Sequence, residues 1–195
     1  MNRMTAAQAL ETLREGNRRF VSGTLENPRR DAARRADIAG GQHPFAAIVA
    51  CSDSRVSPEI IFDQGLGDLF VVRTAGNHID AVGLASIEYA VEHLGVPLVL
   101  VLGHSRCGAA GAAVKQDTAG GRPSAIVSAL APAVERAKRL AGDLADNVSR
   151  ENVRVITARL RSAEPILKNL VDSGRLTIDG AFHDLASGAV ALLDR

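Results

Sequence analysis

The sequence predicts a single-domain α/β protein with a mostly parallel central sheet flanked by helices. Apolar, strand-like runs at residues 45–50, 69–73 and 98–102 alternate with longer helical patterns, the order that builds parallel sheets. Two further runs, 176–183 and 189–193, are joined by a short turn, so the last strand is expected to be an antiparallel edge. A chain of 195 residues is long enough to bury one substantial core.

The chain begins with an amphipathic helix. Thr5 and Gln8 form a capping box, and apolar residues follow at helical spacing as far as Phe20. This helix has one apolar face and precedes the sheet by about 20 residues, so we expect it to pack on something outside its own α/β core. Residues 1–39 are therefore interpreted as a helical arm and residues 40–195 as the core that holds the site.

Helices are predicted between the strands from caps, glycines and helical spacing. They are expected to begin at Ser57, to span 80–94, to follow Cys107, to begin at Ser124 and to span 152–170. Pro132 should kink or break the fourth of these helices, because proline lacks the backbone N–H. Residues 117–123 are predicted to be a loop.

Composition and charge limit the classes of partner. The 23 Lys and Arg residues nearly balance the 22 Asp and Glu residues, which favours a small-molecule partner over nucleic acid or an anionic membrane. The basic stretch 29–35 is interpreted as a solvated face or a subunit contact. No apolar run approaches the ~20 residues of a membrane span, and the amino terminus lacks a signal-peptide core. We expect a cytoplasmic protein, unless a leader has been removed.

Two motifs follow strand-like runs and contain both cysteines of the chain. Cys51 begins Cys-Ser-Asp-Ser-Arg, and His104 begins His-Ser-Arg-Cys-Gly, which includes Cys107. Both motifs lie at the carboxyl ends of predicted parallel strands, the edge where open α/β folds place their sites. Two thiolates and one imidazole suit zinc, and three protein ligands leave a fourth position free, as in catalytic sites. The motifs therefore predict metal-assisted chemistry.

Three other interpretations of the cysteines stay open. They can be inert core thiols, one disulfide, or part of a closed structural zinc site in which Asp53 is the permanent fourth ligand. A disulfide would leave the His-x-x-Cys spacing unexplained, and nothing in the sequence indicates an oxidising compartment.

The two motifs resemble the signature motifs of the β-class carbonic anhydrases. The resemblance runs through nearly the whole chain and includes residues 67–77, 86–91 and 180–188. It implies one zinc ion per chain and the reversible hydration of carbon dioxide to bicarbonate and a proton by zinc-hydroxide attack. It also implies self-association as a dimer or tetramer, with the first helix packing on a partner subunit.

The resemblance assigns roles to residues around the metal. Asp53, paired with Arg55, would orient the hydroxide, and in a closed state Asp53 would itself be the fourth ligand. Gln42, Phe70 and Tyr89 match the substrate cleft of the plant-like, open-site branch of the family.

Three further positions carry expectations. The amide of Gly108, at a helix start, could contact a substrate oxygen. His93 lies one helical turn after Tyr89 and could relay the proton that the metal-bound water loses. Ile48 stands where the bicarbonate-inhibited members of the family have tryptophan, so that inhibitory site is expected to be absent.

Each of these roles has a structural alternative. Asp53 and Arg55 can serve only to stabilise a turn, while Gln42, Phe70 and Tyr89 can be ordinary loop, core and helix residues. For the protein as a whole, two other functions remain open. One is hydrolysis of carbonyl sulfide or carbon disulfide on the same fold, and the other is a non-catalytic zinc or redox-sensing binding protein.

Overall fold

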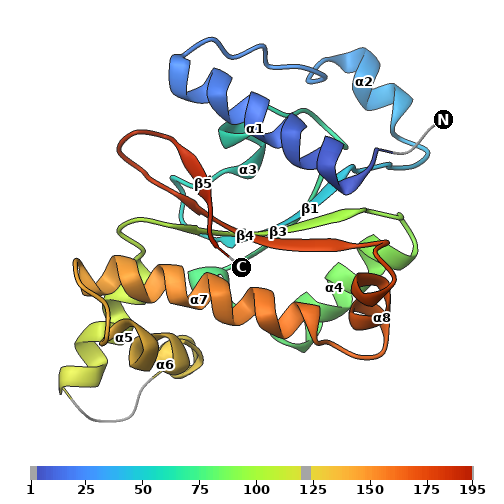
Figure 1. The fold of residues 1–195 in the computed structure, drawn as a ribbon. Coiled ribbons are helices and arrows are strands. Elements are labelled where there is room, and N and C mark those ends of the chain that lie inside the picture. Colours follow the sequence, from blue (N-terminus) through green and yellow to red (C-terminus); the bar gives the residue numbers. More distant parts are fainter. Residues whose placement is uncertain (1–3, 120–123, 195) are drawn as a thin grey trace.

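The structure, a computed structural model, describes residues 4–119 and 124–194 and is built around a five-stranded sheet (Figure 1). The strands are β1 (Ala46–Cys51), β2 (Leu69–Thr74), β3 (Leu98–His104), β4 (Thr177–His183) and β5 (Val190–Leu192). They lie in the order β2-β1-β3-β4-β5; the first four are parallel, and β5 pairs antiparallel with β4. The predicted fold class and the antiparallel edge are confirmed.

Helices cover both faces of the sheet (Figure 1). On one side lie α1 (Ala6–Ser22), α2 (Ala32–Asp37) and α3 (Pro58–Ile61). On the other lie α4 (Ala81–Glu92), α5 (Gly108–Ala119), α6 (Ala125–Ala137), α7 (Leu144–Arg161) and α8 (Ile166–Asp172), and a 3-10 turn, η1 (Ala75–Asn77), precedes α4. Side chains alternate along β1, so that Ile48 packs on the α1 side while Val49 packs with α4 and α7.

The amino-terminal helix packs on the sheet of its own chain. The predicted capping box is present, and Ala9 and Leu13 are buried among side chains of β1 and β3. A parallel sheet needs cover on both faces, and α3, at four residues, is too short to cover this one. The premise that α1 lacks a partner within its own chain is therefore wrong. A contact between α1 and a second subunit stays a prediction.

Asn17 fixes α1 to two other elements. Its Nδ2 donates to the carbonyl oxygens of Ile61 at 3.2 Å and Gly188 at 2.9 Å, and its Oδ1 accepts from the Val190 amide at 2.9 Å. These bonds join α1 to the end of α3 and to the β4–β5 turn, so the first and last segments of the chain support one another.

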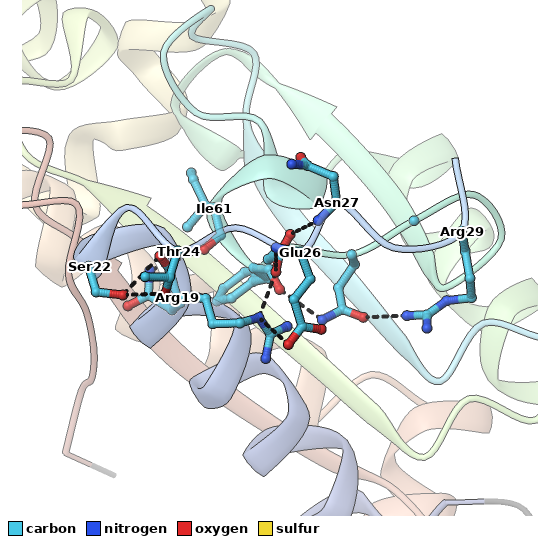
Figure 2. A network of polar contacts seen from close by, with 12 residues as sticks. Arg19, Ser22, Thr24, Glu26, Asn27, Arg29 and Ile61 are labelled. Carbon is cyan, nitrogen blue, oxygen red and sulfur yellow. Dashed lines mark hydrogen bonds and ion pairs between the residues drawn. The ribbon is translucent and has the colours of Figure 1, made fainter. Parts of the chain in front are cut away.

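A polar network holds the chain after α1 against the α3–β2 connection (Figure 2). Arg19 Nε donates to Oδ2 of the fully buried Asp63 at 2.6 Å, and the amides of Glu26 and Asn27 donate to its two oxygens at 3.0 Å each. Burial alone would raise the pKa of Asp63, but Arg19 and the two amides outweigh burial and hold that pKa below its usual value. The carboxylate therefore stays ionised at neutral pH and anchors this segment.

The basic stretch at 29–35 bonds largely within the chain. Arg29 pairs with Asp68 at 2.6 Å, and the side chains of Arg30 and Arg34 donate to backbone carbonyl oxygens near the start of β2. Three of its arginines thus serve the fold. As for membranes, none of the helices in residues 4–119 and 124–194 is long and apolar enough to cross one.

Three predicted boundaries differ from the structure. The helix predicted over 152–170 is two helices, and α7 begins at Leu144, capped by Asp143. The helix α6 continues through Pro132, because its buried face outweighs one missing hydrogen bond. The loop prediction is wrong for residues 117–119, which belong to α5, while 120–123 lie outside the described residues.

The contact between α1 and α3 yields a direct test. A Cβ at Gly16 would lie 1.7 Å from the carbonyl oxygen of Phe62, so Gly16→Ala must push α1 away from the sheet. We expect the free energy of unfolding, measured with urea, to fall by about 2 kcal/mol or more. Gly40→Ala is the control, since a Cβ there meets nothing within 4 Å. Equal stability of the two variants would contradict this packing.

Candidate metal centre

The carboxyl ends of β1 and β3 bring three metal-ligating side chains to one point. Cys51 ends β1, His104 ends β3, and Cys107 follows in the turn before α5. Their ligand atoms all lie within 4.8 Å of one another, and all three residues are buried. Tetrahedral zinc, with bonds of about 2.0–2.3 Å, places its ligand atoms about 3.5 Å apart, and this cluster is close enough to meet that geometry.

The backbone orients the His104 ring for metal binding. Nδ1 lies 2.9 Å from the carbonyl oxygen of Ser105, so Nδ1 carries the proton and donates it. Nε2 is buried and has no hydrogen-bond partner among the described residues. An unpartnered buried nitrogen is unfavourable unless something else binds its lone pair. Nε2 therefore fits a metal ligand whose tautomer is fixed by a second-shell bond.

Cys51 and Cys107 are free, buried cysteines, so they do not form the disulfide that the sequence left open. The amides of Asp53 and Gly76 point at Cys51 Sγ from 3.4 and 3.3 Å. The hydrogen bond from Cys107 lowers the pKa of Cys51 well below its usual value despite burial, and His104 and the two amides add to this effect. The bond to Cys51, followed by burial, raises the pKa of Cys107. Zinc binds thiolates, so metal binding at this pair releases protons.

Unusual backbone conformations surround the ligands. Gly76, Asn77 and Arg106 have φ values of 66°, 43° and 53°. For a residue other than glycine this left-handed conformation costs about 1 kcal/mol or more. Such strain concentrated near one point is typical of a functional site, because the surrounding structure must hold it.

Asp53 pairs with Arg55 and is not part of the ligand cluster. Arg55 Nε and Nη2 donate to its two oxygens at 2.9 and 2.7 Å, which is a bidentate, charge-assisted pair. The hydrogen bond from the Arg55 side chain outweighs burial and holds the pKa of Asp53 well below its usual range. Arg55 Nη2 also donates to the carbonyl oxygen of Arg106 at 3.3 Å. Asp53 is therefore an ionised acceptor, held two residues from a ligand.

Sequence reasoning missed the role of Arg73. Its Nε donates to the carbonyl oxygen of Cys51 at 2.8 Å, and its Nη2 donates to that of Asp53 at 2.6 Å. The side chain thus braces the turn that carries both the ligand and the acceptor. The available signal was a charged residue inside an otherwise apolar strand.

Gln42, Phe70 and Tyr89 lie away from the ligand cluster of their own chain. In the β1–β2 register, Phe70 pairs with Ala47, four residues before Cys51, which is about 13 Å along the strand. The ring of Tyr89 lies 6.3 Å from that of Phe70, and Tyr89 is 47% exposed. Gln42 lies four residues before β1, on the side of the amino ends of the parallel strands, whereas the ligands lie at the carboxyl ends. One chain alone does not bring these residues to the metal.

Of the remaining candidates, His93 lies away from the ligand cluster and Gly108 lies next to it. The ring of His93, which is exposed, lies 5.0 Å from that of Tyr89 and so shares its distance from the cluster. Gly108 begins α5 directly after Cys107, and a Cβ there would meet nothing within 4 Å. The space beside the Cα of Gly108 is therefore open. Ile48 is fully buried in the core on the α1 side of the sheet.

Comparison with known proteins assigns the family. A family model described as carbonic anhydrase matches residues 46–190. Over 190 residues the chain is 43% identical to carbonic anhydrase 2 of Mycobacterium tuberculosis, covering 95% of this chain and 92% of that protein. The solved structure of the β-carbonic anhydrase CcaA aligns with a TM-score of 0.75 at 29% identity, with 95% of each chain covered. The chain belongs to the β-carbonic anhydrases.

Two further relatives agree with this assignment. The carbonic anhydrase of Mycolicibacterium smegmatis is 40% identical over 188 residues, which cover 94% of this chain and 91% of that protein. The Coccomyxa β-carbonic anhydrase in complex with acetazolamide aligns with a TM-score of 0.73 at 26% identity, covering 95% and 86% of the two chains. β-Carbonic anhydrases are zinc-dependent, and the cluster of Cys51, His104 and Cys107 fits that ion.

Zinc content gives a test of the centre. Protein purified without chelator should contain about one zinc per chain, measured by elemental analysis. Cys107→Ser should lose most of this zinc, because two protein ligands do not hold the ion firmly. Ser52→Ala is the matched control, since the exposed Ser52 follows a ligand directly. Full zinc occupancy in Cys107→Ser would rule out this ligand set.

Proposed function

We propose that this chain catalyses the reversible hydration of carbon dioxide to bicarbonate and a proton, with Asp53 and Arg55 as the catalytic pair. The observation that carries the proposal is the trio of Cys51, His104 and Cys107 at the carboxyl edge of the sheet, with an ionised carboxylate held beside it. Zinc, when bound, supplies the Lewis acidity that makes water a nucleophile at neutral pH.

Asp53 orients the attacking water. An ionised carboxylate can only accept hydrogen bonds, so the water must donate to Asp53 and turn a lone pair toward the substrate carbon. Arg55 supports this in two ways. It keeps Asp53 ionised, and by holding both carboxylate oxygens it keeps Asp53 from becoming a metal ligand.

Gly108 serves the substrate oxygen. Its amide lies at the start of the 12-residue helix α5, where unpaired N–H groups and the helix dipole favour negative charge. Charge develops on the oxygens of carbon dioxide as bicarbonate forms, so a donor here stabilises the product-like state.

A second copy of the chain completes the substrate cleft. Phe70, Tyr89 and Gln42 match cleft positions of the family but lie far from their own metal centre. The edge strand β2 is only half-buried along most of its length, and on α4 Val82 and Tyr89 are 75% and 47% exposed. An apolar sheet edge left open in this way favours a subunit contact. Two β-carbonic anhydrases of Sordaria macrospora are described as tetrameric.

The proposed assembly is therefore at least a dimer through β2 and α4. It would place Gln42, Phe70 and Tyr89 of one copy at the metal centre of the other, with His93 beside them. We also infer a cytoplasmic location, since a ligand set with two thiolates is preserved where thiols stay reduced.

Stopped-flow assay of the zinc-loaded protein tests the reaction itself. It should hydrate carbon dioxide at a rate far above the buffer control. The same preparation assayed with carbonyl sulfide and carbon disulfide distinguishes the related hydrolases. Zinc-loaded protein that leaves carbon dioxide unchanged would exclude the proposed function, whatever it does to the sulfur compounds.

The catalytic pair is tested by substitution and pH. Arg55→Ala should keep zinc and lose about 100-fold or more in turnover, because Asp53 is then free to reach the metal. Arg55→Lys keeps the charge but not the bidentate geometry and should be intermediate. Because the pKa of Asp53 is held below its usual value, Asp53 is ionised from about pH 6 to 9. Activity should rise over that range as the attacking water ionises. A flat profile, or normal turnover in Arg55→Ala, would contradict these roles.

Complementation tests the shared cleft. Asp53→Ala should inactivate the metal side of a site, and the double variant Phe70→Ala/Tyr89→Ala should inactivate the side given by the other copy. Mixed dimers of the two proteins contain one intact site, so unfolding and refolding them together should recover about a quarter of wild-type activity. Each variant refolded alone is the control. A mixture no more active than its components would mean that each cleft is built from one chain.

A further inference from the structure

Helix α7 carries three polar residues on one face, Asp146, Ser149 and Asn152. Their spacing of three places them one above another along the helix. Ser149 and Asn152 are 2% and 1% exposed, so these polar groups face the protein interior. Buried polar side chains are unfavourable unless they are hydrogen-bonded. Here each of these three residues forms a hydrogen bond with the backbone beside a metal ligand.

Asp146 acts on the turn between His104 and Cys107. Its Oδ1 accepts from the Arg106 amide at 2.7 Å. The same peptide group carries the Ser105 carbonyl oxygen, which accepts from His104 Nδ1 at 2.9 Å. Arg106 has a φ of 53°, and its own carbonyl oxygen accepts from Arg55 Nη2 at 3.3 Å. One left-handed residue thus connects Asp146 both to a metal-ligating ring and to the arginine of the catalytic pair.

Ser149 acts on His104, and Asn152 acts on the turn beside Cys51. Ser149 Oγ donates to the carbonyl oxygen of His104 at 2.9 Å. Asn152 Nδ2 donates to the carbonyl oxygen of Gly76 at 2.8 Å, and the Gly76 amide donates to Cys51 Sγ at 3.3 Å. Gly76 is also left-handed, with a φ of 66°. Both strained turns of the site are therefore bonded to the same helix.

We propose that Asp146, Ser149 and Asn152, the α7 stripe, are positioning residues that set the geometry of the metal ligands and of Arg55. In many metal sites a carboxylate accepts directly from a ligating histidine and fixes its orientation. Here the carboxylate of Asp146 acts through one peptide group, whose polarisation by the charged acceptor strengthens the bond to His104 Nδ1. The inference rests on the proposed function for its consequence in turnover, but its effect on metal binding stands alone.

A purely structural role for Asp146 makes a different prediction. An acidic residue in the first turn of a helix is favourable wherever it points, so such a role needs no particular acceptor atom. The positioning role needs the oxygen that bonds the Arg106 amide. Asp146→Asn keeps that oxygen and loses the charge, whereas Asp146→Ala loses both.

The first experiment compares these variants in the full, zinc-loaded chain. In Asp146→Ala we expect hydrogen exchange of the Arg106 amide to accelerate about 10-fold or more, since its acceptor is gone. We also expect zinc affinity, measured by competition with a chromogenic chelator, to fall about 10-fold. Asp146→Asn should recover most of both quantities. Asn147→Ala is the matched control, because Asn147 lies in the same helical turn and bonds Ala141 instead.

The second experiment tests the other end of the stripe. Asn152→Ala should weaken zinc binding about 10-fold, because the turn that aims the Gly76 amide at Cys51 loses its support. Thr157→Ala is the control. Thr157 is a buried polar residue of the same helix whose hydroxyl has no hydrogen-bond partner among the described residues. Ser149→Ala removes a single hydroxyl and should also weaken zinc binding, so it carries the test if either larger truncation fails to fold.

Zinc affinity and amide exchange need no substrate, so they report on the stripe even if the protein proves inactive toward carbon dioxide. If Asp146→Ala, Ser149→Ala and Asn152→Ala bind zinc as tightly as their controls, the proposal is overturned. It is overturned for Asp146 as well if Asp146→Asn is as impaired as Asp146→Ala. If turnover falls while zinc affinity and hydrogen exchange of the Arg106 amide stay unchanged, the variants do not act through the metal ligands, and the proposal is likewise overturned.

Discussion

The structure depends on holding two sulfurs and one imidazole nitrogen together in a buried place. Thiolates lose hydration there, so each must receive hydrogen bonds from the protein. Backbone amides supply them, and the amides of Asp53 and Gly76 reach Cys51 because the chain turns sharply at both places. The left-handed residues near the site follow from this need. The left-handed backbone conformations are unfavourable in themselves, but they aim the amides that stabilise the buried thiolate.

Much of the fold and the ligand set could be predicted from the sequence. Apolar runs of strand length marked β1 and β3, and parallel pairing requires that their carboxyl ends meet at one edge. Cys51, His104 and Cys107 then had to lie near one another, as they do. The resemblance to the β-class carbonic anhydrases predicted the pair of Asp53 and Arg55, and the two side chains form a bidentate contact. For the ligands local signals sufficed, since they lie at strand ends and in one short turn.

The parts that could not be predicted depend on contacts distant in sequence. Asp146 and Ser149 look like solvent-facing residues until α7 is placed beneath β3, and the prediction began that helix too late to include them. Arg73 gained its role only from the register of β2 against β1. The single amphipathic face of α1 did not reveal which surface it would cover. Its apolar residues fit the chain's own sheet, and periodicity alone carries no information about the partner.

The position of the ligands on two separate strands bears on how the metal is acquired. Cys51 and His104 approach each other only after β1 and β3 have paired in parallel, and that pairing joins segments separated by α3, β2, η1 and α4. Parallel pairing across such a distance closes a long loop, which is a slow step in folding. A complete ligand set therefore exists only where β1 and β3 have paired. The ligand set of this protein is thus a product of its sheet, unlike that of small domains that are ordered by their zinc.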